Sequence, residues 1–313
     1  MSYSIGVDLG GTNLRAAVID ASGNLVRSAR RSLDDTSVDG CLRTLDAVFD
    51  ELAPLDADWP IGVGIAAQVR AGSGDVAVAP NLGWRDEPFA RRLQAHVGRR
   101  VRLVNDLNAI AKGESDVGAG QGTRHLVCVF VGTGTGMGAV VEGKLMEGWH
   151  GFATEIGHTK VASPETGRRC GCGQRGCLEA YTSGRHLPEL FAEVRARGIP
   201  SPLNPERMAM TAGAIERAGA DGDPVAQVLW DEVGERLARA VGDVVTVFNP
   251  EVLVLGGGVL AAAPSLASRV RERLFAYAGV AQQQGLAVRA STLGDDAGIV
   301  GAALLALQEA RAP

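Results

Sequence analysis

The chain repeats one local pattern twice: an apolar strand, a loop of glycine and threonine, and a second strand. The first copy, residues 5–19, carries the letters LGGTN at 9–13, and the second copy, residues 126–142, carries GTGTG at 132–136. The first loop is unusually rich in glycine for a hairpin turn. We interpret the two copies as an ancient duplication that brings two phosphate-binding loops to face each other.

A third glycine turn, GGG at 256–258, follows the apolar strand at 252–255. Loops after buried strands of an open α/β sheet present backbone N–H groups to anions, and glycine lets phosphate oxygens come close. Asp8, at the end of the first strand, is placed to hold hydrated Mg²⁺ beside a polyphosphate. Hydroxyl groups add donors at Thr12, Thr133 and Thr135. One such loop is equally well an ordinary turn, but three together favour phosphate binding.

Two better-known nucleotide motifs are excluded letter by letter. Residues 138–144 spell GAVVEGK, but Leu145 stands where a P-loop needs serine or threonine, and the segment is predicted to be a strand. Residues 132–138 carry glycine at every second position and therefore do not spell the dinucleotide fingerprint GxGxxG. A dinucleotide is not the expected ligand.

Asn105 and Asp106 lie where a strand ends and a helix begins, an edge at which α/β folds often place catalytic groups. Asp106 is suited to accept a proton from a substrate hydroxyl that attacks a γ-phosphoryl group, while Asn105 orients the same substrate. The alternative, an Asp or Asn helix N-cap, is the better explanation when this residue pair is taken alone.

Three cysteines lie within the segment CGCGQRGCLE at 170–179, which we call the cysteine knuckle. In a reducing compartment such a cluster indicates a metal rather than a disulfide. The predicted ligand set of a closed, tetrahedral zinc site is His158, Cys170, Cys172 and Cys177. Free thiols are the alternative. A nucleic-acid-binding zinc ribbon would need a second knuckle and more basic residues than this segment has.

Two carboxylates accompany the cysteine cluster. Glu155 precedes His158 by three residues, so both side chains share one face if the segment is helical. Glu179 directly follows the last thiol, where a bound metal would hold it ready to accept a hydrogen bond from a hydroxyl group.

Composition excludes several classes of partner. The 313 residues carry a net charge of −5 with a pI near 5.6, so no basic field invites nucleic acid or anionic lipid. The sequence shows neither a leader at its start nor ~20 consecutive apolar residues, and it predicts a cytoplasmic protein without membrane contact. Small molecules or other proteins are the expected partners.

Hydrophobic periodicity predicts an α/β chain with two lobes. The smaller, N-terminal lobe is expected at 1–118 plus 297–313, and the larger lobe, with the cysteine knuckle, at 119–296. Hinges are expected near 118–122 and 295–298. The expected strands are 5–8, 14–19, 61–67, 101–104, 126–131, 137–142 and 252–255, and the expected helices are 38–52, 107–117, 224–247, 264–277 and 297–310.

Taken in order, the motifs resemble the ROK family (repressor, ORF, kinase) of sugar kinases, with the bacterial glucokinases as the nearest pattern. They cover nearly the whole chain: DLGGTN from Asp8, APNLGW from Ala79, ND at Asn105, GTGTGMG from Gly132, EIGH from Glu155, CGCGQRGCLE from Cys170 and LGGGV from Leu255.

The resemblance implies a two-lobed, actin-like (ribonuclease H-like) ATPase fold with an inter-lobe cleft. It places phosphates and metal at Asp8, Gly10, Gly11 and Thr12, a second phosphate loop at Gly132, Thr133 and Gly134, and the adenosine near Gly256 and Gly257. It assigns sugar hydroxyls to Asn81, Asn105, Asp106, Glu155, His158 and Glu179, with Asp106 as the base. One ring nitrogen of His158 would bind the structural Zn²⁺ and the other would face the sugar.

The implied activity is ATP- and Mg²⁺-dependent phosphorylation of a hexose, first of all glucose to glucose 6-phosphate, which belongs to glycolysis and carbohydrate metabolism. The resemblance also implies a homodimer, and related glucokinases accept polyphosphate. The segment at 65–69 lacks the Pro-Gly pair common in the family, which leaves the identity of the hexose open. An N-acetylhexosamine or fructose kinase is the alternative within the family. A non-catalytic sugar sensor is the alternative of another class, although it would not need Asp106 together with intact phosphate loops. Only seven residues precede Asp8, so repression through an N-terminal DNA-binding helix pair is not expected.

Overall fold

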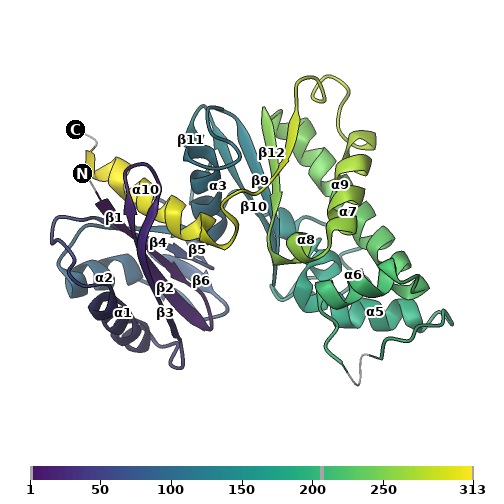
Figure 1. Cartoon of the computed structure of the whole chain (residues 1–313), viewed down its shortest axis with the longest axis horizontal. Helices are drawn as coiled ribbons and strands as arrows, with labels where there is room; N and C mark the ends of the chain where they lie inside the picture. Colours follow the sequence, from purple (N-terminus) through teal and green to yellow (C-terminus); the bar gives the residue numbers. More distant parts are fainter. Residues whose placement is uncertain (1–2, 205–207, 312–313) are drawn as a thin grey trace. The chain divides into compact units, whose positions relative to one another are not determined.

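The structure, a computed structural model, describes residues 3–204 and 208–311. The chain forms two compact units (Figure 1). Unit 1 comprises residues 1–126, 138–154 and 292–313, and unit 2 comprises residues 127–137 and 155–291. None of the helices within the described ranges is both long enough and apolar enough to cross a membrane.

The first sheet of unit 1 has the strand order β3-β2-β1-β4-β8. Its strands are β1 (Tyr3–Leu9), β2 (Asn13–Asp20), β3 (Leu25–Ser32), β4 (Ile61–Ile65) and β8 (Val101–Asn105). The three N-terminal strands pair antiparallel, whereas β1, β4 and β8 run parallel. This arrangement puts the C-terminal ends of β1 and β8, with Asp8 and Asn105, at one edge of the sheet.

Helices cover this sheet: α1 (Val38–Leu52), α2 (Phe89–Val97), α3 (Asp106–Asp116) and α10 (Ala297–Arg311). The C-terminal helix α10 packs against β1 and β4 so closely that a Cβ on Gly62 would lie 1.8 Å from the carbonyl oxygen of Ala302 (Figure 1). Glycine is therefore required at this crossing, because any side chain would push the helix off the sheet.

A small antiparallel sheet in unit 1 joins β5 (Gln68–Val69), β6 (Val76–Ala79) and β7 (Trp84–Glu87). The sequence pattern did not predict it, because its strands are short. The turn between β6 and β7 carries Asn81, whose side chain is exposed.

The second five-stranded sheet has the order β11-β10-β9-β12-β13. Its strands are β9 (Leu126–Val131), β10 (Thr135–Val141), β11 (Lys144–Leu145), β12 (Val252–Gly256) and β13 (Ala287–Ala290). When the five strands of each sheet are renumbered 1 to 5 in chain order, both sheets have the same spatial order, 3-2-1-4-5. The shared strand plan predicted from the two glycine loops is thus confirmed at the level of whole sheets.

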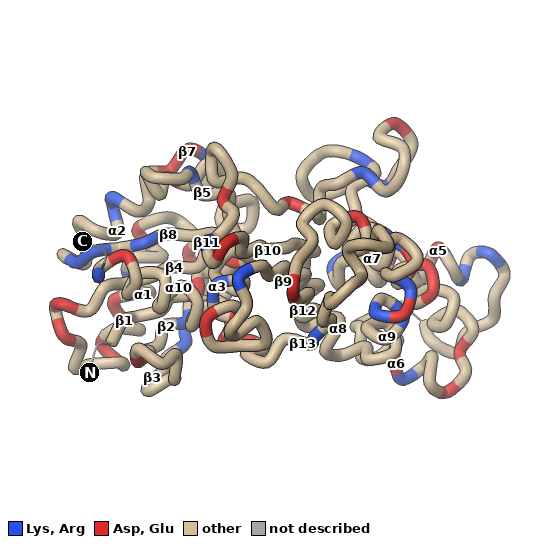
Figure 2. The backbone as a smooth tube through the Cα atoms, turned by 90° about the horizontal axis from the view of Figure 1, so that it is seen from above, with Lys and Arg blue, Asp and Glu red and all other residues tan. Residues whose placement is uncertain are grey.

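β11 and most of β10 belong to unit 1. Apart from its strands, unit 2 is largely helical: α4 (Glu179–Thr182), α5 (Leu187–Arg195), α6 (Ala212–Ala220), α7 (Pro224–Phe248), α8 (Gly258–Ala262) and α9 (Pro264–Arg273). The long helix α7 begins at the Asp223 cap, whose carboxylate accepts hydrogen bonds from two backbone amides, and it ends at Asn249 in the left-handed conformation. Acidic and basic residues are scattered over both units (Figure 2).

The division of the chain differs from the expected lobes, since residues 119–126, 138–154 and 292–296 belong to unit 1. Contacts with helix α3 explain why these residues belong to unit 1. The buried carboxylate of Glu114 in α3 accepts hydrogen bonds from the amides of Ala119 (2.8 Å) and Leu293 (3.2 Å). In β10, a Cβ on Gly138 would lie 2.4 Å from the carbonyl oxygen of Leu107 in the same helix. Helix α3 therefore gathers three separate stretches of chain.

Candidate functional site

The first predicted phosphate loop connects β1 and β2 in unit 1. The amide of Gly10 donates to the carbonyl of Asn13 at 3.0 Å, and the exposed Thr12 offers its hydroxyl at the tip. A Cβ on Gly11 would lie 2.8 Å from the Cβ of Asn81 and 3.1 Å from its carbonyl oxygen. The loop and the Asn81 turn are thus in contact, and two segments assigned to phosphate and sugar lie side by side.

Asp8 lies beside this loop, opposite Arg15 in the β1–β2 pairing. Burial raises the pKa of the Asp8 carboxyl above its ordinary 3.8, and the charges of Arg15 and Arg30 only partly offset that effect. A poorly solvated carboxylate gains more from a divalent cation than an exposed one does, so Asp8 suits the predicted Mg²⁺ role.

Asn105 is the N-cap of α3, and its side chain is fully hydrogen-bonded. Its Oδ1 accepts from the amides of Leu107 (2.9 Å) and Asn108 (3.2 Å). Its Nδ2 donates to the carbonyl of Ala67 (3.1 Å) and to Oδ1 of Asp106 (3.0 Å). The capping alternative therefore holds for Asn105, and its amide also fixes the half-buried Asp106 carboxylate at the start of the helix.

The second predicted phosphate loop follows β9. The amide of Gly132 donates to the carbonyl of Gly134 (2.8 Å), and the carbonyl of Gly132 accepts from Gly184 (2.8 Å). Thr135 is buried and its hydroxyl pairs with that of Thr182 at 2.9 Å, so it does not supply the free donor that the sequence suggested. Thr133 remains the hydroxyl of this loop.

Glu179 links this loop to the cysteine knuckle. Its Oε2 accepts a hydrogen bond from the amide of Thr135 at 3.2 Å, and its Oε1 lies 3.6 Å from Sγ of Cys170. A Cβ on Gly134 would lie 2.7 Å from Oε2, so glycine leaves the room that this carboxylate occupies. Loop, carboxylate and thiol form one connected set.

Glu155 and His158 lie on one 3₁₀ turn, η1 (Ile156–His158), as their spacing predicted. A Cβ on Gly157 would lie 2.0 Å from the carbonyl oxygen of Thr135, so this turn packs directly on β10. Thr154, just before Glu155, has φ 68°, which is rare for a β-branched residue. The sequence carries no signal for this strained backbone, which sets the direction in which the chain enters the Glu155 turn.

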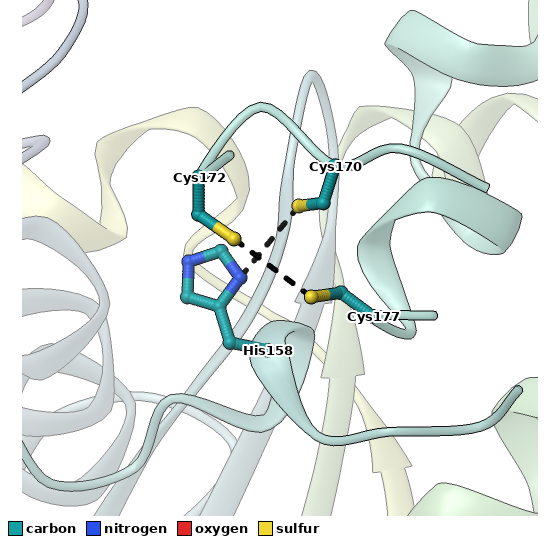
Figure 3. Close-up of side chains that lie close together, drawn as sticks. All are labelled: His158, Cys170, Cys172 and Cys177. Carbon is teal, nitrogen blue, oxygen red and sulfur yellow. Dashed lines mark hydrogen bonds between the residues drawn. The ribbon is translucent and has the colours of Figure 1, made fainter. Parts of the chain in front are cut away.

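The four predicted metal ligands come together in unit 2 (Figure 3). One ligand atom from each of His158, Cys170, Cys172 and Cys177 lies within 4.8 Å of all the others. The Cys172 and Cys177 sulfurs are 3.8 Å apart, as are Sγ of Cys170 and Nδ1 of His158. Tetrahedral Zn–S bonds of about 2.3 Å place two sulfurs about 3.8 Å apart.

Donor types and spacing therefore both fit Zn²⁺. With no metal bound, burial raises the pKa of the Cys170 thiol to about 12, so metal binding there displaces a proton. Nδ1 of His158 faces the sulfurs, which leaves Nε2 for the second role that the family resemblance implies.

Gly256 and Gly257 lie where β12 ends and α8 begins. A Cβ on Gly256 would lie 2.6 Å from the ring of Phe130, and Gly257 has φ 91° with the Val131 carbonyl oxygen 2.5 Å from a Cβ placed there. Packing against β9 explains why both must be glycine. Their assignment to the adenosine stays a prediction.

Comparison with known proteins identifies the family and the relatives of the chain. The ROK family matches residues 4–309. A glucokinase of Streptomyces coelicolor is 33% identical over 98% of both chains, and an N-acetyl-D-glucosamine kinase of Pectobacterium carotovorum is 30% identical over 97% of this chain and 99% of its own. The crystal structure of a ROK glucokinase from Streptomyces griseus, in complex with glucose and AMPPNP, superposes with a TM-score of 0.83 at 32% identity and covers 98% of this chain and all of that one.

These matches confirm the α/β, actin-like ATPase fold that the motifs implied. The predicted site residues cluster within each unit: Asp8, the first loop, Asn81, Asn105 and Asp106 in unit 1, and the second loop, Glu155, Glu179 and the knuckle in unit 2. The family match spans both groups and nearly every residue between them, and the chain belongs to the ROK family.

Proposed function

We propose that this protein transfers the γ-phosphoryl group of Mg-ATP to a hexose, with the 6-hydroxyl of glucose as the favoured acceptor. The observation that carries the proposal is the Asp106 carboxylate, held by the Asn105 amide and the α3 N-terminus in a chain with two phosphate loops. The glucokinase relatives, one of them solved with glucose and an ATP analogue, support the same reaction.

In this mechanism the carboxylate of Asp106 accepts the proton of the sugar hydroxyl. The hydroxyl oxygen forms a bond to the γ-phosphorus while the bond between that phosphorus and the β–γ bridging oxygen breaks, and ADP leaves with the electron pair. Asn105 acts through Asp106 as a positioning residue. Asp8 would hold Mg²⁺, an ion that would add positive charge beside the phosphates, and backbone amides of the glycine loops donate to the phosphate oxygens.

Sugar recognition is assigned to exposed or half-buried polar side chains on both units: Asn81 and Asp106 on unit 1, and Glu155, His158 and Glu179 on unit 2. Structural Zn²⁺ would fix the knuckle, and with it His158 and the neighbouring Glu179. The inter-lobe cleft and a homodimer complete the proposal as the family resemblance implies them.

An N-acetylhexosamine kinase is the second candidate, which the Pectobacterium relative favours at 30% identity. ADP release with Mg-ATP, measured with glucose, N-acetylglucosamine, N-acetylmannosamine, mannose and fructose, separates the candidates. Stimulation by glucose above all other sugars supports the proposal, and preference for an N-acetylated sugar supports the alternative. If no sugar stimulates ADP release, and polyphosphate does not replace ATP, the result contradicts the kinase proposal and favours the non-catalytic sugar sensor.

Substituting Glu179→Gln is expected to raise the KM for the sugar roughly 10- to 100-fold while kcat changes less, because a hydrogen bond to a charged acceptor contributes about 1.5–3 kcal/mol. Glutamine preserves the shape and can still accept from the Thr135 amide. Glu165→Gln, an exposed glutamate that precedes the knuckle in the sequence, is the matched control. A sugar KM unchanged in Glu179→Gln would remove this residue from the sugar site.

Asp8→Asn is expected to abolish the thermal stabilisation that Mg-ATP gives the wild type, without destabilising the ligand-free protein. The raised pKa of Asp8 means that its charged form disfavours folding, so the wild type is relatively more stable below pH 3.8 and loses that advantage as pH rises through the raised value. The ligand-free variant should therefore melt at or above the wild-type Tm at pH 7, and this difference should vanish on acidification. A Mg-ATP shift that persists in Asp8→Asn would contradict the metal role.

A further inference from the structure

Lys160 has a place beside the cysteine knuckle that neither the motifs nor the proposed reaction account for. It follows the η1 turn and forms an isolated antiparallel bridge with Cys177. The amide of Leu178 donates to the carbonyl of Thr159 at 2.9 Å, which ties the same two stretches together. These backbone contacts fix the start of the Lys160 side chain next to a predicted metal ligand.

The Lys160 ammonium contacts that ligand directly. Its Nζ lies 2.9 Å from Sγ of Cys177 and 2.6 Å from Oε1 of Gln174. Cys177 is fully buried, whereas Lys160 is an exposed residue. The ammonium of an exposed lysine thus donates hydrogen bonds to a buried sulfur and to the side-chain amide oxygen of Gln174. Two acceptors hold the ammonium in place.

Two of the nearby arginines, Arg168 and Arg175, are engaged elsewhere, and Arg185 approaches Gly171 rather than a sulfur. Arg168 pairs with Glu189 and Glu193 on α5, and Arg175 donates to the carbonyl of Gly167 at 2.9 Å. Among the hydrogen bonds of the described residues, the one from a lysine or arginine side chain to a sulfur of the knuckle is that of Lys160.

The contact between Lys160 and Cys177 bears on the net charge of the zinc site. Three thiolates and a neutral imidazole around Zn²⁺ leave a net charge of −1, and the Glu179 carboxylate, 3.6 Å from Cys170, adds a further negative charge. A charged donor on a metal-bound thiolate withdraws electron density from the sulfur and makes it a poorer nucleophile. A cation at this position also offsets the excess negative charge of the cluster.

We propose that Lys160 is a charge-balancing positioning residue of the metal knuckle, whose ammonium donates to the Cys177 thiolate, retards loss of Zn²⁺ and shields that sulfur from electrophiles. The inference rests on the zinc site of the proposed function. It concerns metal retention rather than phosphoryl transfer, so it can fail while the kinase activity stands.

The test compares Lys160→Met with the wild type by the rate at which zinc passes to a chromogenic chelator. Methionine keeps an unbranched, flexible side chain of similar length without the charge, and the backbone bridge to Cys177 does not depend on the side chain. We expect release to be about tenfold faster, the lower end of what outer-shell partners of metal ligands contribute. Lys160→Arg should stay within about twofold of the wild type, since a charged donor is retained.

Two further measurements separate charge from mere structure. Lys144→Met, an exposed lysine on β11, is the control and should release zinc at the wild-type rate. Alkylation by N-ethylmaleimide, mapped by mass spectrometry, should reach Cys177 sooner in Lys160→Met than in the wild type. Equal zinc release and equal alkylation in Lys160→Met and the wild type overturn the inference, and a wild-type protein without zinc overturns the zinc site itself.

Discussion

Asp106→Asn is expected to lower kcat for sugar phosphorylation by about 10²- to 10⁴-fold, the usual contribution of a positioned general base. Asparagine keeps an Oδ1 that can accept from the Asn105 amide and the Leu107 N–H, which are 3.0 and 2.9 Å away in the wild type. The geometry at the start of α3 is thereby preserved, and only the ability to take a proton is lost. Steady-state ADP release with saturating glucose measures the effect.

Sugar binding should survive this substitution, which distinguishes a catalytic base from a residue needed for folding. Isothermal titration of glucose into Asp106→Asn should still give a measurable Kd, raised at most about 100-fold, since one hydrogen bond to a charged acceptor contributes about 1.5–3 kcal/mol. Asp46→Asn, an exposed carboxylate that pairs with His96 on the surface, serves as the control with unchanged kcat. Full turnover by Asp106→Asn would remove Asp106 from the role of base.

Cys172→Ser should have the second large effect, on stability and sugar affinity together. Loss of one thiolate weakens a site whose metal contributes to folding, and the Tm should fall by roughly 5–10 °C. Cys170 lies 3.8 Å from Nδ1 of His158 and 3.6 Å from Glu179, so a loosened knuckle also releases two side chains assigned to the sugar. Zinc content by plasma emission spectrometry, Tm and the sugar KM should change in concert.

Cys128→Ala is the matched control, because this thiol is buried in β9 away from the ligand set. It should lose about 1 kcal/mol of stability from the small void, with full zinc content and an ordinary sugar KM. Zinc-free wild-type protein with a normal sugar KM would contradict the metal account, and so would a Cys172→Ser variant that keeps both its zinc and its affinity.

Elements with strong local signals were predictable from the sequence. Helix α1 has the predicted bounds, Val38–Leu52, because a regular apolar period coincides with the Ser37 cap. The predicted strand at 61–67 ends at Ile65 in the structure, and the predicted helix at 264–277 ends its α-helical part at Arg273 and continues as a 3₁₀ turn. Apolar residues continue past both ends, so composition gave no stop signal.

Site features that depend on long-range contacts were not predictable. The zinc ligands could be named because three of the four are close in sequence and their donor chemistry is distinctive. By contrast, the contact of Gly11 with the Asn81 turn joins residues 70 positions apart, and the Lys160–Cys177 bridge joins residues 17 apart. No local pattern encodes either contact. The strained Thr154 backbone is likewise set by what packs around it rather than by the residue itself.

The central claim is phosphoryl transfer from ATP to glucose, and product analysis tests it most directly. Purified protein incubated with Mg-ATP and glucose should form ADP and glucose 6-phosphate in equal amounts, identified by ³¹P nuclear magnetic resonance, and both should depend on the sugar and on Asp106. ADP formed at the same rate with and without sugar, or no phosphorylated sugar at all, would contradict the account.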